Sequence, residues 1–169
     1  MRKTVLILLC ALTVLSFAGC KDTGKTSHSV DIEYFANMGA VPESELKIGD
    51  SVPEIEEYDD NYFVSSDGDD SFFSNGEFNF FYDTSEKEPK INKIACFSKS
   101  FGFEIGDISI EIINALEDAG IKYTERAEKD GELSFLPKSD NRSVVECRSL
   151  KHKLVFVFED NALCATVIE

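Results

Sequence analysis

Five aspartates crowd one short segment of this sequence, around Gly68. They are Asp59, Asp60, Asp67, Asp69 and Asp70. Calcium takes about six to eight oxygen ligands, so Asp67, Asp69 and Asp70 form a weak candidate metal site. An EF-hand loop would need a carboxylate at the position that Phe63 holds, and the motif fails there. A solvated acidic loop is therefore favoured, and no metal or other cofactor is predicted.

Histidine is scarce, which limits the chemistry that this chain could perform. The only two histidines are His28 and His152. Nucleophilic catalysis by a Ser/His/Asp or Cys/His set needs a histidine that a third group orients within a pocket. Nothing in the sequence places either histidine in that way, and His152 is expected in a solvated turn. No catalytic residue is predicted, and the protein is not expected to be an enzyme.

Three cysteines lie in the part of the sequence that is expected to fold: Cys96, Cys147 and Cys164. None has the C-x-x-C spacing typical of zinc or thioredoxin-like sites. Cys147 and Cys164 lie on predicted strands of the same half and are the candidate pair for a disulfide. The alternative, that the cysteines are small buried thiols on strands, is favoured.

Aromatic residues are concentrated in the segment 62–82, where they outnumber what one face of a small sheet needs. Surplus aromatic residues often anchor protein interfaces. We therefore predict partner-binding residues here, namely Tyr62, Phe72, Phe73 and Phe81. The alternative is that both faces of their sheet are covered and that these rings belong to a core.

Charge and composition exclude two classes of protein. The formal net charge is −15, and the acidic side chains are not offset by a basic stripe, so no nucleic-acid partner is expected. Hydrophobic residues make up 43% of the chain, enough apolar surface to form a folded domain rather than a disordered acidic chain.

The first twenty residues have the pattern of a targeting segment. Arg2 and Lys3 precede an apolar run from Thr4 to Leu15, which is too short to span a bilayer as a helix. Phe17-Ala18-Gly19-Cys20 then resembles the lipobox of bacterial lipoproteins. The resemblance implies cleavage before Cys20 and diacylglycerol on its sulfur. The alternatives are an ordinary signal peptide that is cut elsewhere, or an uncleaved anchor.

This pattern divides the N-terminal region into a lipoprotein signal peptide, residues 1–19, and a flexible linker, residues 20–29. A coil of this length reaches about 15–18 Å. The lipid on Cys20 would hold the protein at the cell membrane, facing outside the cytoplasm.

Two eight-residue strings resemble each other, IGDSVPEI at 48–55 and IGDISIEI at 105–112, and both begin Ile-Gly-Asp. The repeat predicts two tandem units, residues 30–101 and 102–169. Each Gly-Asp step is interpreted as a helix start, so helices are expected over 53–58 and 108–119. Gly120 should close the second helix, with Ile121 folding back on Leu116.

Alternating apolar residues and turn signals predict the strands. Strands are expected at 62–65, 72–73, 78–82, 91–98, 133–136, 143–148, 153–158 and 162–168. Asn75-Gly76 predicts a hairpin turn, and Val30 to Met38 is compatible with either a helix or an edge strand.

The duplicated helix-plus-sheet pattern resembles the beta-lactamase-inhibitor-protein-like fold, which also includes a small lipoprotein of the outer-membrane barrel assembly machinery. The resemblance runs from about Leu46 to Glu169 and depends on Gly49, Gly106 and the strand pattern. It implies an α+β fold of two tandem repeats, each a helical segment packed on a small antiparallel sheet. It also implies protein binding across a sheet face.

The expected function is therefore that of a membrane-anchored, non-catalytic binding or scaffold lipoprotein. Its expected partner is another envelope or secreted protein, engaged through the sheet face that carries Phe81. The alternative function is a module that binds a cation or small ligand at the acidic loop.

Overall fold

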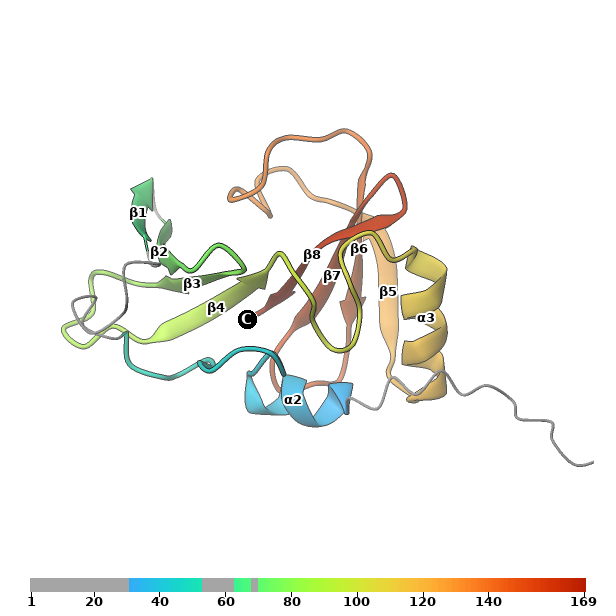
Figure 1. Cartoon of the computed structure of the whole chain (residues 1–169), viewed down its shortest axis with the longest axis horizontal. Helices are drawn as coiled ribbons and strands as arrows, with labels where there is room; N and C mark the ends of the chain where they lie inside the picture. The colour runs from blue at the N-terminus through green and yellow to red at the C-terminus, as the bar shows by residue number, and fades with distance from the viewer. Residues whose placement is uncertain (1–30, 53–62, 68–69) are drawn as a thin grey trace, which may run out of the picture.

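The computed structural model describes residues 31–52, 63–67 and 70–169. These residues form one antiparallel sheet of eight strands and two short helices (Figure 1). The strands are β1 (Phe63–Asp67), β2 (Asp70–Ser74), β3 (Phe78–Tyr82), β4 (Ile91–Cys96), β5 (Tyr123–Ala127), β6 (Arg142–Cys147), β7 (Leu154–Glu159) and β8 (Ala162–Ile168). The helices are α2 (Ile32–Met38) and α3 (Ser109–Asp118).

The predicted fold class was wrong, because the strands do not form two small sheets with a helix on each. Their order is β1-β2-β3-β4-β8-β7-β6-β5, so two runs of four strands join edge to edge at β4 and β8. With only two short helices in the described residues, the fold is mainly β rather than α+β.

The pairing of β4 with β8 explains why a single sheet forms. The paired residues are Ile94 with Ile168, Ala95 with Val167 and Cys96 with Thr166. All six are buried, so an unpaired edge here would leave backbone N–H and C=O groups without partners inside the core. Joining the two edges gives these groups partners.

The two Gly-Asp steps occupy equivalent positions beside the strands β4 and β8. In the first, Gly49 N donates to Ile91 O and Ile91 N donates to Asp50 O, at 2.8 and 2.9 Å. In the second, the N–H of Gly106 and the carbonyl of Asp107 make the same two bonds to Leu163, both at 2.8 Å. The repeated string therefore marks a repeated turn that attaches to the start of β4 and of β8.

Each of these turns is closed by its own aspartate, so Asp107 does not start α3 as predicted, and the helix predicted after Asp50 lies outside the described residues. Asp50 Oδ2 accepts from Lys47 N at 3.0 Å, and Asp107 Oδ2 accepts from Glu104 N at 2.8 Å. The intervening glycines have φ of 90° and 100°, a conformation that favours glycine. Helix α3 begins instead after Ile108, whose side chain cannot cap it.

The end of α3 confirms the predicted closure. Gly120 has φ of 72°, Ile121 N donates to Leu116 O, and Gly120 N donates to Glu117 O. This is the Schellman arrangement, with Ile121 and Leu116 both buried. The segment that was compatible with helix or strand forms α2, which Asp31 caps through a bond from Tyr34 N.

Two strand predictions failed for identifiable reasons. Residues 133–136 lie in turns of the connection between β5 and β6, where the carbonyl of Leu133 accepts from Leu136 N at 2.9 Å. Strand β5 was missed because its sequence, YTERA, shows no apolar alternation. It lies at the edge of the sheet and pairs with β6 alone.

Alternate residues of the strands enter two apolar clusters, one on each face of the sheet. The larger cluster includes buried residues of both helices, such as Ala36, Ile112 and Leu116. The smaller cluster lies under the connection 128–141, which contributes Leu133. Figure 1 shows this connection and α2 on opposite sides of the sheet. The helices therefore cover one face, and a loop covers part of the other.

Several predictions fall outside the described residues. These include the signal peptide 1–19, the linker 20–29 with the lipidation site Cys20, and the helix at 53–58. Neither of the two described helices has the length and apolar character needed to cross a membrane.

Candidate functional site

The structure places two of the four predicted partner-binding aromatic residues in the core. Phe73 and Phe81 are 1% and 2% exposed, on opposite faces of the sheet. Phe72 is half-buried beside Phe81, with 5.2 Å between ring centroids, and Tyr62 lies outside the described residues. Phe73 and Phe81 therefore belong to a core, which was the alternative interpretation of these rings, because both faces of their strands are covered.

The acidic segment includes the end of β1 and the start of β2. Asp67 ends β1 and Asp70 begins β2, so the two residues are opposite each other in the hairpin, and Asp69 lies outside the described residues. Among the residues whose side chains are described, no group of three or more His, Cys, Asp or Glu is placed to hold a metal ion.

The three described cysteines, Cys96, Cys147 and Cys164, are free thiols, so the candidate disulfide between Cys147 and Cys164 is absent. Cys147 belongs to the cluster on the helix side, whereas Cys164 packs against the cluster on the other face. The sheet therefore separates them. Burial raises the pKa of Cys147 to about 12, which keeps this thiol protonated at neutral pH.

His152 is less exposed than a solvated turn would make it. It is half-buried against Gly39, where an added Cβ would lie 3.0 Å from His152 Nε2. Burial lowers the pKa of His152, and the charge of Lys151 lowers it further. His152 is therefore neutral at pH 7 and fills space between α2 and the turn before β7.

Three isoleucines near the start of α3 are unusually exposed for large aliphatic residues. Ile105, Ile108 and Ile110 are 43%, 49% and 53% exposed, and we call them the isoleucine patch. The sequence contains a signal for Ile110, because Ile110 and Ile112 are two positions apart and cannot share one face of a helix.

The connection 128–141, here called the β5–β6 loop, is attached to the sheet by ion pairs that two of its first five residues make. Glu132 makes two bonds to the Arg126 guanidinium, which also donates to Glu146 at 2.9 Å. Glu128, the first residue of the loop, accepts from Arg142 at the start of β6 at 2.9 Å. The loop is therefore a fixed part of the fold.

The Arg126 pair should make stability depend on pH in the acid range. Hydrogen bonding to Arg126 lowers the pKa of Glu132 from 4.5 to about 2. A carboxylate with a lowered pKa stabilises the fold above its unfolded pKa, and this contribution is lost as the pH falls through the folded pKa. Wild type should therefore exceed Glu132→Gln in unfolding free energy above pH 4.5, and the difference should shrink between about pH 4.5 and about pH 2.

Urea denaturation at several pH values measures this difference. Glu169→Gln is the control, because Glu169 pairs with Lys153 at 2.7 Å where both side chains are more than a third exposed. Its effect on stability should be small at every pH. A difference between wild type and Glu132→Gln that stays constant from pH 6 to pH 2 would contradict the prediction.

Arg142 is a buried cation, since its side chain is only 3% exposed. Its two terminal nitrogens are bonded, Nη1 to Glu128 Oε2 at 2.9 Å and Nη2 to the carbonyl of Pro137 at 2.7 Å. Its Nε is buried and has no hydrogen-bond partner in the described residues. The surrounding residues leave Nε no surface that a water molecule could reach, and the Cys164 side chain also hydrogen-bonds to Arg142.

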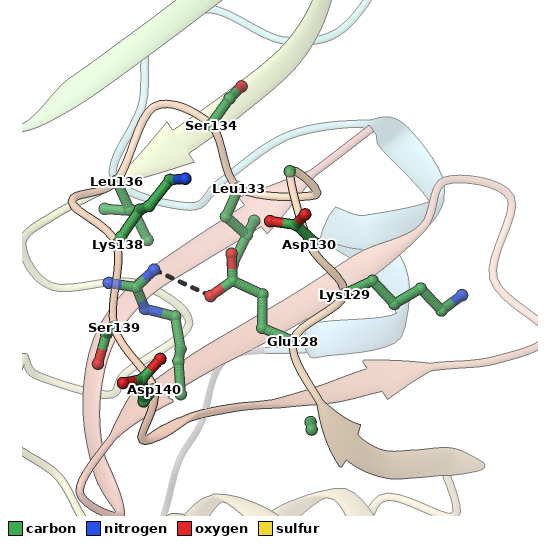
Figure 2. Close-up of a pocket in the computed structure, with 12 residues that line it drawn as sticks. Glu128, Lys129, Asp130, Leu133, Ser134, Leu136, Lys138, Ser139 and Asp140 are labelled. Carbon is green, nitrogen blue, oxygen red and sulfur yellow. Dashed lines mark hydrogen bonds and ion pairs between the residues drawn. The ribbon is translucent and has the colours of Figure 1, made fainter.

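A cavity of about 500 Å³ lies between the β5–β6 loop and β6, and Arg142 lines it. Leu133 and Leu136 give it an apolar side, and Asp130 and Asp140 add carboxylates. Figure 2 shows the Glu128 carboxylate turned toward its dashed contact with Arg142. We call this space the loop cavity. This cavity was not predicted, because its residues belong to a loop that was expected to contain a strand.

No protein-family model, no curated protein and no solved structure matches this chain. The functional argument therefore depends on the residues themselves.

Proposed function

We propose that this protein is a membrane-anchored lipoprotein that acts outside the cytoplasm as a non-catalytic binding or scaffold module for another envelope or secreted protein. The charged start, the short apolar run and the lipobox-like residues that end at Cys20 support the anchor. The observation that carries the binding role is the isoleucine patch.

The isoleucine patch has the composition of an interaction surface. Single exposed apolar residues are common, but three large aliphatic side chains within six positions are more than a solvated turn requires. Acidic residues surround them in the sequence, with Glu104 and Glu111 exposed. An apolar centre with a charged rim is typical of protein interfaces. The partner surface should be apolar at its centre and basic at its edge.

The isoleucine patch replaces the surface that the sequence indicated. Phe81 and Phe73 cannot contact a partner while they are buried in the sheet. The alternative function, cation or small-ligand binding at the acidic loop, concerns side chains that lie outside the described part of the chain.

Cross-linking of the full chain in native envelopes tests the anchor and the surface separately. Cys20→Ser should move the protein from the membrane fraction to the soluble fraction. Ile108→Ser combined with Ile110→Ser should leave the protein in the membrane fraction but reduce cross-linking to its partner about tenfold or more. The cross-linked band whose intensity falls in the double variant identifies the partner.

Met38→Ser is the matched control, because Met38 is 44% exposed on α2, away from the isoleucine patch. It should leave cross-linking unchanged. Equal cross-linking of the double variant and wild type would refute the binding surface, and retention of Cys20→Ser in the membrane fraction would refute the lipid anchor.

A further inference from the structure

We propose that the protein partner docks by adding a strand to β5, at the open edge of the sheet beside α3. The added strand runs antiparallel to β5, with a basic side chain opposite Glu125 and an apolar side chain on each side of it. This docking mode rests on the proposed binding function and adds the backbone geometry and the sequence pattern of the partner segment.

The hydrogen bonds between β5 and β6 show which backbone groups of β5 face the open edge. Arg148 N donates to Lys122 O at 2.6 Å, and Glu128 N donates to Arg142 O at 3.2 Å. Hydrogen-bonded and non-bonded pairs alternate along an antiparallel ladder, so the even-numbered residues of β5 bond to β6 and the odd-numbered ones direct their N–H and C=O groups outward. The outward residues are Tyr123, Glu125 and Ala127.

The outward edge of β5 is accessible to another chain. Glu125 and Ala127 are exposed and Tyr123 is half-buried. Within the described part of the chain, the three outward N–H groups have no hydrogen-bond partner, and among the outward carbonyls only that of Ala127 accepts, from Arg126 Nη1 at 3.2 Å. Such a row of unpaired N–H and C=O groups is a template for an extended peptide, which gains its affinity from main-chain hydrogen bonds.

The helix α3 gives an added strand a second surface to contact. Tyr123 OH donates to Glu117 Oε1 at 2.8 Å, so α3 lies beside the start of β5 (Figure 1). Ile110, Ile113 and Glu117 are spaced by three and four positions and therefore share one side of this helix. Ile110 belongs to the isoleucine patch and is 53% exposed. Side chains that an added strand directs to the helix face of the sheet would enter the layer that contains α3.

The charge at this edge favours a basic segment. Hydrogen bonding to Glu117 raises the pKa of Tyr123, and the charge of Glu125 raises it further, so both carboxylates lie near this hydroxyl. A Lys or Arg opposite Glu125 would add a cross-strand pair of opposite charge. A second copy of this chain is disfavoured, because two antiparallel β5 strands centred on Glu125 would place like charges opposite each other.

Calorimetric titration of the full chain with synthetic peptides tests the docking mode. The probe is acetyl-Thr-Ile-Thr-Lys-Thr-Ile-Thr-amide, whose Lys would face Glu125 and whose Ile residues would face Tyr123 and Ala127. It should bind, and the same peptide with Glu in place of Lys should bind about tenfold more weakly. N-methylation of Lys and both Ile residues removes the N–H groups that face β5 and should abolish binding, whereas N-methylation of the two Thr residues beside Lys should not.

Variants assign the binding to the edge of β5. Ala127→Pro removes one outward N–H and keeps every bond to β6, so the fold should persist while binding of the Lys peptide weakens about tenfold. Because proline could also disturb the strand, Glu125→Lys provides a second test, which should make the Glu peptide bind more tightly than the Lys peptide. Glu86→Gln, exposed in the turn between β3 and β4, is the control and should change neither.

Three results would overturn this docking mode. One is the absence of heat with the Lys peptide up to about 10 mM. Another is unchanged binding after N-methylation of Lys and both Ile residues, since backbone pairing would then play no part. The third is a dimer of the full chain that Ala127→Pro separates, which would show that a second copy occupies the edge.

Cross-linking in native envelopes separates this docking mode from the proposed function. Ala127→Pro should reduce the partner band about as much as the double isoleucine variant does. A band that depends on the isoleucine patch but not on Ala127 would leave the binding function in place and refute strand addition. A band that depends on neither would refute both.

Discussion

Replacing Glu128 by glutamine is expected to lower the free energy of unfolding by about 3–5 kcal/mol. The change keeps the shape of the side chain but removes the charge that faces Arg142 at 2.9 Å. Arg142 is 3% exposed, and Glu159, its other acidic neighbour, is 3.8 Å away and 46% exposed. A buried guanidinium would therefore lose its main counter-charge, which is the most costly way to break such a pair.

Urea denaturation at pH 7 measures this loss. Glu86→Gln is the control, because Glu86 is exposed in the turn between β3 and β4, and it should change the unfolding free energy by less than about 0.5 kcal/mol. The double variant Glu128→Leu and Arg142→Met should recover most of the lost stability, since no charge is then buried alone. A loss below about 1 kcal/mol for Glu128→Gln would contradict the described pairing.

Phe156→Ala is expected to cost about 3–5 kcal/mol, the range for removing a buried aromatic ring. Phe156 is completely buried on β7, and two further rings pack on it edge to face. The Phe101 and Phe103 rings lie with centroids 6.2 and 5.7 Å from that of Phe156. Both come from the turn between β4 and α3, so the cavity would open where this turn meets the sheet.

Thermal and urea unfolding measure the effect, and Phe135→Ala is the matched control. Phe135 lies in the β5–β6 loop and contacts Phe81 at 5.2 Å between centroids, but it is only partly buried. It should cost clearly less than Phe156→Ala, because part of its surface already contacts water and the loop can relax. Equal losses would show that the loop is as tightly packed as the centre of the sheet.

The sequence predicted local elements well where side-chain pattern and backbone bonding agree. The hairpin at Asn75-Gly76 forms as expected, with Asn75 Oδ1 accepting from the N–H groups of Glu77 and Phe78. Alternation along β3 also places Phe80 and Phe81 on opposite faces. These features are set by neighbours in the chain, so they can be read without knowledge of the fold.

The features that were missed depend on contacts between distant residues. The residues around Ala95 and Val167 do not indicate that their strands pair. This pairing nevertheless determines whether the chain forms one sheet or two. The apolar residues of 133–136 were predicted to form a strand. A loop that packs on a sheet contains the same apolar residue types as a buried strand. The loop cavity likewise requires Arg142 and Glu128 to meet across 14 positions.

The partner site was predicted from ring abundance alone, and this is why its residues were misplaced. Counting aromatic residues cannot tell whether the second face of a sheet is covered, and here the β5–β6 loop covers the face that carries Phe81. The exposure of Ile108 and Ile110 follows from where α3 begins, which the Gly-Asp turn sets.

The β4–β8 junction imposes an order on folding. The strand β8 is the last of the described strands along the chain. It nevertheless pairs with β4, whose residues lie about seventy positions earlier. During synthesis, the edge of β4 that pairs with β8 stays without its hydrogen-bond partners until β8 has been made. Contacts between residues so far apart in the chain also form slowly. Nascent chains that stop short of β8 would thus be the species most prone to associate through that edge.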